Sequence, residues 1–144
     1  MSTVYLVDKS AWEWARRDTV ARADFTQIIG EGITATCHAA TMEVLYSARS
    51  PEDYERLRFR WTSLAQLPDP SASTYEADMA WVMDRAMDVQ RLLTATGEWR
   101  RPVTHLMIAA CAERAGATVL HVDKDYSLIA QVTGQPERRL ATSE

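Results

Sequence analysis

Cysteine is scarce in this sequence, and long apolar runs are missing from it. The two cysteines, Cys37 and Cys111, lie far apart and form no metal-ligand spacing, so we predict neither a disulfide framework nor a zinc knuckle. We expect both to be reduced thiols in the core. No stretch approaches the roughly 18 apolar residues of a membrane span, and the start MSTVYLVDKS lacks the features of a signal peptide. We therefore expect a cytoplasmic protein with no membrane partner.

An excess of charge of one sign is also missing. The 16 Lys and Arg residues against 20 Asp and Glu residues give a net charge of -4, which argues against nucleic-acid binding through a global basic field but leaves a local basic rim possible. The 144 residues, 47% of them hydrophobic and 25% charged, exclude a disordered or fibrous chain. We predict a single domain over residues 1–144.

Strand-like and helical patterns alternate along the chain. Short β-prone runs at 4–7, 33–37 and 117–122 are each followed by helical spacing. The cap Ser50, Pro51, Asp53 and a capping box formed by Ser73 and Glu76 predict two helix starts. Further helices are predicted at 41–48 and 103–115, and a last one contains Leu128, Ile129 and Val132 and stops at Gly134. Residues 67–73 can hold at most a very short strand. This alternation predicts an α/β fold with a mainly parallel central sheet flanked by helices.

Four acidic residues fall where strands end. Asp8 follows the first strand, Glu43 opens the helix after the second, and Asp123 and Asp125 follow the third. The carboxyl ends of parallel strands share one edge of a sheet, where sites form, and carboxylates gathered there need a compensating charge. We predict a Mg²⁺ or Mn²⁺ site of the kind that activates water in metal-dependent nucleases.

Each acid also has a purely structural interpretation. Asp8 and Asp125 are suited to capping helices, Glu43 to pairing with an arginine, and Asp123 to a turn. Taken singly, each is better explained in this way. The joint placement of all four at strand ends favours the site.

Three blocks of the sequence resemble a known family. These are VYLVDKSAW, EVLYSARSPEDYERLR and IAACAERAGATVLHVDKDYSLIAQVTGQP, which are similar in order and spacing to the PIN domain of VapC-type toxins. The resemblance implies a three-layer fold, a homodimer, a Mg²⁺- or Mn²⁺-dependent RNA endonuclease, and a VapB-type antitoxin whose tail fills the site. It also implies that Asp8, Glu43, Asp123 and Asp125 are the catalytic acids, and that the Ser10 hydroxyl supports Asp8.

His105 departs from the family pattern, in which an aspartate usually occupies its position. The change removes one carboxylate from the expected ligand set and weakens the attraction for a hard cation. A neutral imidazole still suits Mn²⁺ better than Mg²⁺, and the dipole at a helix amino terminus favours the neutral form. We weigh a metal ligand and a hydrogen-bonded histidine in a degenerate site equally. The sequence alone does not distinguish a natural histidine at this position from an engineered replacement of the family aspartate.

Arginines and tryptophans are the remaining candidates for contacts with partners. Arginine offers paired donors to phosphate oxygens, and candidates for RNA binding are Arg100, Arg101, Arg49, Arg56, Arg58 and Arg60. A solvated helix face is the favoured explanation for Arg49, Arg56, Arg58 and Arg60, and it is weighed equally with phosphate binding for Arg100 and Arg101. Trp12 and Trp14 are suited to stacking on bases or to anchoring an antitoxin helix.

The sequence therefore supports one leading function and two alternatives. The first is a toxin endoribonuclease that uses a metal-activated water and is inhibited by an antitoxin. The second is a catalytically impaired PIN protein that binds antitoxin or RNA without efficient cleavage because of His105. The third is another Mg²⁺-dependent hydrolase of phosphate esters.

Overall fold

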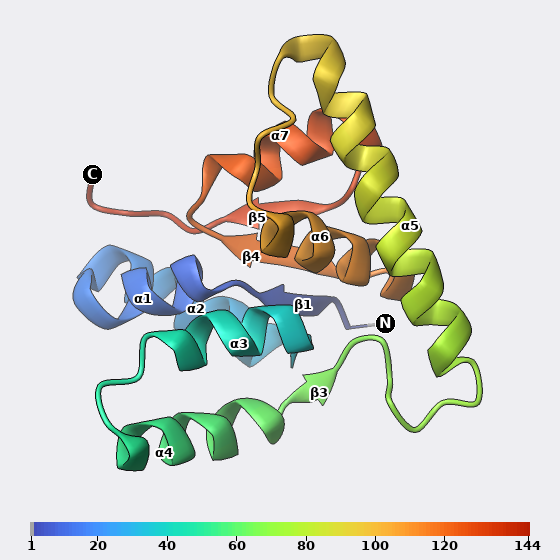
Figure 1. Cartoon of the computed structure of the whole chain (residues 1–144). Helices are drawn as coiled ribbons and strands as arrows, with labels where there is room; N and C mark the ends of the chain where they lie inside the picture. Colours follow the sequence, from blue (N-terminus) through green and yellow to red (C-terminus); the bar gives the residue numbers. More distant parts are fainter. Residues whose placement is uncertain (1) are drawn as a thin grey trace.

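The computed structural model describes residues 2–144, which form a parallel sheet between two layers of helices (Figure 1). The strands are β1 (Val4–Val7), β2 (Ile33–Thr36), β3 (Ala65–Gln66), β4 (Thr118–His121) and β5 (Glu137–Arg139). The α-helices are α1 (Lys9–Arg17), α2 (Thr19–Glu31), α3 (His38–Tyr46), α4 (Pro51–Thr62), α5 (Tyr75–Leu93), α6 (Val103–Ala115) and α7 (Lys124–Thr133). The sheet order is β3-β2-β1-β4-β5, and every neighbouring pair is parallel. The predicted three-layer α/β fold is confirmed.

Helices cover both faces of the sheet, and because side chains alternate along each strand, the central strands β1 and β4 send apolar side chains into a core on both faces. In β1, Leu6 joins a core cluster with residues of α5, α6 and α7, whereas Val7 joins a second cluster with residues of α1, α2 and α4. Helix α3 contributes to both clusters, Ala40 to the first and Val44 to the second. The two clusters hold the central strands in place. Because these strands are parallel, the carboxyl ends of β1, β2 and β4 lie at one edge of the sheet.

Of the two predicted helix starts, one is confirmed and one is wrong. The cap of α4 is confirmed, because the Ser50 Oγ accepts a hydrogen bond from the Asp53 backbone N–H at 3.0 Å. The capping box of Ser73 and Glu76 is wrong. Thr74 is the N-cap of α5 and makes no side-chain cap bond, and its hydroxyl instead donates to the Asp78 carboxylate.

The strands also depart from the sequence pattern. The segment 67–73, judged able to hold at most a very short strand, holds none, and the short strand β3 lies just before it, beside β2. Strand β5 was not predicted, because Glu137–Arg139 consists of charged residues and pairs on one side only, with β4. An edge strand of this kind carries no apolar alternation to reveal it.

Two helices, not one, follow β1. Asp18 ends α1 and caps α2, where its carboxylate accepts from the Ala21 N–H. Helix α3 begins at His38, earlier than predicted, so Glu43 lies within the helix and does not open it. Its side chain nevertheless reaches the expected edge of the sheet.

The remaining expectations from composition concern cysteines and membrane spans. Cys37 and Cys111 are free and buried in the core, as predicted. Within residues 2–144, no helix combines the length and the apolar character needed to cross a membrane.

Gly32 packs so closely against the Thr3 backbone and the Tyr5 ring that a side chain at this position would clash with them. A Cβ at this position would lie 2.7 Å from the Thr3 carbonyl oxygen and 2.8 Å from the Tyr5 ring. We expect Gly32→Ala to lower the free energy of unfolding by about 1 to 3 kcal/mol through this overpacking. Gly30→Ala is the control, because a Cβ there meets nothing within 4 Å and alanine favours helix α2 by about 0.5 to 1 kcal/mol. Urea denaturation measures both, and equal stability of the two variants would contradict the prediction.

Candidate metal centre at the carboxyl edge of the sheet

Asp8 lies at the centre of the site, and three hydrogen bonds hold its carboxylate. It directly follows β1 and is 1% exposed. Its Oδ2 accepts hydrogen bonds from the Ser10 N–H at 3.0 Å and the Ser10 hydroxyl at 2.5 Å, and its Oδ1 accepts from the Tyr126 hydroxyl at 2.7 Å. Asp8 is therefore both the N-cap of α1, as its structural interpretation required, and a carboxylate fixed at the sheet edge.

Ser10 and Tyr126 connect Asp8 to the rest of the site. The Ser10 hydroxyl also accepts from the Val122 N–H at 2.9 Å, which ties α1 to the loop after β4. Burial and the nearby Asp8 charge raise the pKa of Tyr126 well above its ordinary value, so its hydroxyl remains a donor. Ser10 was predicted as a support, but Tyr126 was missed, because nothing in the sequence distinguishes it from other core aromatics.

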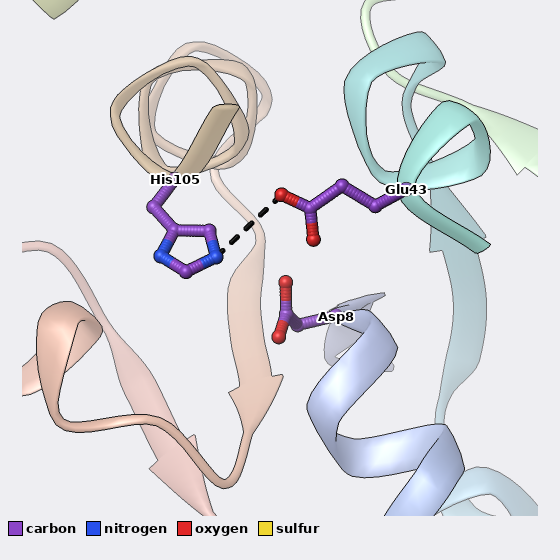
Figure 2. A group of neighbouring side chains, drawn as sticks. All are labelled: Asp8, Glu43 and His105. Atoms are coloured by element: carbon purple, nitrogen blue, oxygen red, sulfur yellow. Dashed lines mark ion pairs between the residues drawn. The ribbon is translucent and has the colours of Figure 1, made fainter. Parts of the chain in front are cut away.

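Glu43 and His105 face each other, and Asp8 lies beside them (Figure 2). Glu43 comes from α3 and His105 from the first turn of α6, and the His105 Nε2 lies 3.5 Å from the Glu43 Oε1. Asp8, Glu43 and His105 each offer one donor atom within 4.8 Å of the others. The three residues converge although almost a hundred positions separate the first from the last.

Asp123 and Asp125 complete the cluster from the far side of His105. Asp123 caps α7, with its Oδ1 accepting from the Asp125 N–H at 2.9 Å, and its other oxygen lies 3.8 Å from the His105 Nδ1. The Asp125 carboxylate accepts from His105 Nδ1 at 2.7 Å and from Arg101 Nη1 at 2.8 Å. His105, Asp123 and Asp125 form a second group of donors within 4.8 Å.

The charges of the site favour a protonated His105. Burial lowers the pKa of His105, but the hydrogen bond to Asp125 and the charges of Asp8, Glu43 and Asp123 outweigh it and raise the pKa above its ordinary value. These charges act against the neutral imidazole expected from the helix dipole. Four carboxylates act at closer range than the helix terminus does.

Arg101 has a different role from the one predicted. Its guanidinium forms ion pairs with Asp125 at 2.8 Å and with Glu98 at 3.1 Å. Burial raises the pKa of Asp125, but the hydrogen bonds from His105 and Arg101 outweigh burial and leave that pKa below its ordinary value. Arg101 is thus committed to carboxylates of the site, not open to a phosphate.

The other candidates lie outside the cluster. Arg100 stacks over Trp99, with its guanidinium carbon 5.1 Å from the ring centroid. Arg49 lies in the loop after α3 and lines a separate pocket with Trp12. The Arg17 guanidinium carbon lies 4.7 Å from the centroid of the Trp14 ring, so the two groups stack.

The donor set suits a divalent cation. Two groups of donors share His105: Asp8 and Glu43 lie in one group, and Asp123 and Asp125 in the other. Their carboxylates are the hard oxygen ligands that Mg²⁺ and Mn²⁺ prefer. One imidazole nitrogen shifts that preference toward Mn²⁺. Both oxygens of Asp125 are engaged by His105 and Arg101, which makes Asp125 an orienting group around the donors.

Comparison with known proteins identifies the family to which this arrangement belongs. The model of the PIN domain matches residues 5–132. The chain belongs to the PIN-domain family. Relatives include Ribonuclease VapC18 of Mycobacterium tuberculosis, 38% identical over 92% of this chain and 92% of that protein, and Ribonuclease VapC51 of the same organism, 36% identical over 94% and 92%.

Solved structures agree on the fold of this PIN domain. The chain superposes on a chain of VapBC2 from Rickettsia felis, bound to a promoter DNA fragment, with a TM-score of 0.69, 13% identity and coverage of 96% and 100%. VapBC-1 from nontypeable Haemophilus influenzae gives a TM-score of 0.68 at 12% identity, with coverage of 95% and 98%. At these identities the likeness concerns the fold alone.

Proposed function

We propose that this chain is the toxin of a type II toxin-antitoxin system, an endoribonuclease that depends on Mg²⁺ or Mn²⁺. The observation that carries the proposal is the convergence of Asp8, Glu43 and Asp123 on His105 at the carboxyl edge of a PIN domain. Relatives of the same length are named ribonucleases, which supports RNA as the substrate. An enzyme that acts on cellular RNA works in the cytoplasm.

Each side chain of the site has its own role in the proposed reaction. Asp8, Glu43, Asp123 and His105 would hold the cation, which when bound lowers the pKa of a water and stabilises charge on the phosphate. Ser10 and Tyr126 fix the Asp8 carboxylate. Asp125 orients His105, and Arg101 offsets part of the negative charge.

A VapB-type antitoxin is the partner we propose. Two solved structures of similar fold are VapBC2 of Rickettsia felis and VapBC-1 of nontypeable Haemophilus influenzae, which supports a VapB-type partner for this chain. An antitoxin side chain that carries a positive charge would relieve the repulsion among the carboxylates as a metal does. Inhibition and metal binding would then be competitive.

The metal requirement tests the proposed function directly. We expect RNA cleavage in Mn²⁺ or Mg²⁺ to stop in EDTA and to return when metal is restored. Asp123→Asn should lower cleavage and Mn²⁺ affinity by at least about tenfold, since ligand loss exceeds the usual effect of outer-shell changes. Asp84→Asn, on the exposed face of α5, is the matched control and should change neither. Undiminished cleavage in EDTA would refute metal dependence.

One observation favours the impaired PIN protein as a second candidate. His105 already bridges Asp125 at 2.7 Å and Glu43 at 3.5 Å, so an imidazolium satisfies the cluster without metal. In this alternative the chain still binds its antitoxin. Cleavage would then be slow in both metals while the complex forms normally.

We also propose that the chain forms a homodimer through an apolar face on α5 and α6. Met83, Met87 and Val103 are 52%, 70% and 63% exposed, and they line one shallow groove. Exposed apolar groups gathered in this way are typical of an interface. The partner surface would be the same face of a second copy.

Light scattering tests the dimer. We expect the chain to be dimeric at micromolar concentration, and Met87→Asp to weaken association at least about tenfold by burying a charge in the interface. Phe59→Asp, on α4 and 76% exposed, is the control that should leave the dimer intact. A monomeric parent chain without antitoxin would refute the proposal.

A further inference from the structure

A polar pocket outside the metal centre is lined by arginines. Its volume is about 520 Å³, and it is formed by α1, the end of α3 with the following loop, and α4. In Figure 1 the loop between α3 and α4 lies at the left edge of the molecule, below α1. The pocket, called the arginine pocket below, contains Arg16, Arg49, Arg56 and Arg60.

Three of these arginines have no carboxylate partner within residues 2–144. Arg56 pairs with Asp53, and Glu13, the other acid of the lining, pairs with Lys9 at 3.4 Å. No ion pair involves Arg16, Arg49 or Arg60 in the described part of the chain. The pocket therefore concentrates positive charge in a chain whose net charge is negative.

The arginine side chains are also positioned by their surroundings. The Arg16 guanidinium stacks on the Trp12 ring, 4.5 Å from its centroid. The Arg49 backbone N–H donates to Asp53 at 3.0 Å, which fixes the loop that presents Arg49. Guanidinium groups match the oxygens of a phosphate, because arginine presents paired donors in a rigid plane, and Arg16 is already oriented by its stacking on Trp12.

The arginine pocket is one helical turn from the carboxylates. Along α1, Trp12 follows Asp8 by four residues, and along α3, Ser47 follows Glu43 by four residues. One turn of helix is about 5.4 Å. A single nucleic-acid strand can therefore place one phosphate at the metal centre and a neighbouring phosphate in the arginine pocket.

We propose that the arginine pocket binds the backbone of the RNA substrate, through Arg49 and Arg60 together with Arg16, at a phosphate next to the one that lies at the metal centre. This inference rests on the proposed function, because it names where the substrate of that site is held. An acidic peptide from a partner is the competing occupant. The lining favours RNA, since only Trp12 and Leu57 are apolar among its residues, and a docked peptide would find little apolar surface to bury.

The test compares two double variants in RNA binding. Arg49→Gln with Arg60→Gln removes two proposed phosphate contacts. Arg91→Gln with Arg139→Gln removes the same charge from exposed positions that do not line the pocket. Fluorescence anisotropy of a 12-nucleotide single-stranded RNA in EDTA measures binding without cleavage and without the metal.

We expect the pocket variant to bind this RNA about tenfold more weakly and the control to bind like the parent chain. The slope of log Kd against log salt should fall by about 1.4, or about 0.7 for each lost phosphate contact. In cleavage assays the pocket variant should show a raised KM with kcat within about twofold. Equal Kd values and slopes for the two double variants would overturn the inference.

Two further outcomes separate the possible failures. RNA binding that depends on the pocket, in a chain that never cleaves, would refute the proposed function and leave this inference standing. A hexaglutamate peptide that binds the parent chain and loses affinity in the pocket variant, while RNA affinity is unchanged, would assign the pocket to an acidic peptide and overturn the inference.

Discussion

Replacing His105 by aspartate is expected to raise RNA cleavage in Mg²⁺ by at least about tenfold. The carboxylate restores the residue that PIN domains usually have here and adds a hard oxygen ligand between Glu43 and Asp125. It also removes an imidazolium that competes with the cation for these acids. Changes outside the ligand shell typically alter metal affinity 10- to 100-fold, so tenfold is a lower bound for a restored ligand. Mn²⁺, which accepts nitrogen ligands, should gain less.

The same substitution should destabilise the metal-free protein. The hydrogen bond between His105 and Asp125 is lost, and a fifth carboxylate joins the cluster, so we expect a loss of about 2 kcal/mol in the free energy of unfolding. Added Mg²⁺ should restore this stability, because a ligand that binds only the folded state stabilises it. Thermal unfolding with and without metal therefore reports on the site independently of cleavage.

Two variants control for this result. His38→Asp makes the same change at an exposed position at the start of α3 and should leave metal-dependent stability unchanged. Asp8→Ala combined with His105→Asp should abolish the gain, because both residues act on one cation. Equal cleavage by the parent chain and His105→Asp in both metals would show that His105 does not contact the metal.

The parts of the fold that carry the site were predictable from the sequence. The strands before Asp8 and Asp123 are apolar and β-branched, and burial on both sheet faces requires that pattern. Parallel pairing then brings their carboxyl ends together whatever the loops do. The charged strand β5 escaped prediction because only pairing with β4 makes it a strand.

The detail of the site was less predictable, because it depends on which side chains meet. The sequence could not show that Arg101 would turn to Asp125 and not to solvent. Nor could it show that four acids would surround His105 closely enough to raise its pKa. The sequence likewise could not separate Arg58 from Arg49 and Arg60, which only the packing of α1, α3 and α4 brings to one pocket.

Asp8→Asn should produce the largest loss of the series, at least about 100-fold in cleavage and in Mn²⁺ affinity. Asparagine has nearly the same shape, so the substitution removes a negative charge at the centre of the cluster with little change in packing. The metal-free protein should lose some stability, because an asparagine amide cannot accept at both positions where Asp8 accepts from Ser10 and Tyr126, and weaker repulsion with Glu43 offsets only part of this loss. A loss of Mn²⁺ affinity larger than that of Tyr126→Phe, which removes one of these hydrogen bonds but keeps the charge, would locate the effect in the metal.

The residues that hold Asp8 should give smaller, graded losses. Ser10→Ala removes the 2.5 Å hydrogen bond to Oδ2, and Tyr126→Phe removes the 2.7 Å hydrogen bond to Oδ1. Each leaves the charge in place but frees its orientation, so we expect Mn²⁺ affinity to fall about 10- to 100-fold. Tyr54→Phe, on α4, is the control for loss of a phenol hydroxyl and should have no effect. If Asp8→Asn cleaves RNA within threefold of the parent while Tyr126→Phe does not, Asp8 is not a ligand, and its buried carboxylate serves only to cap α1.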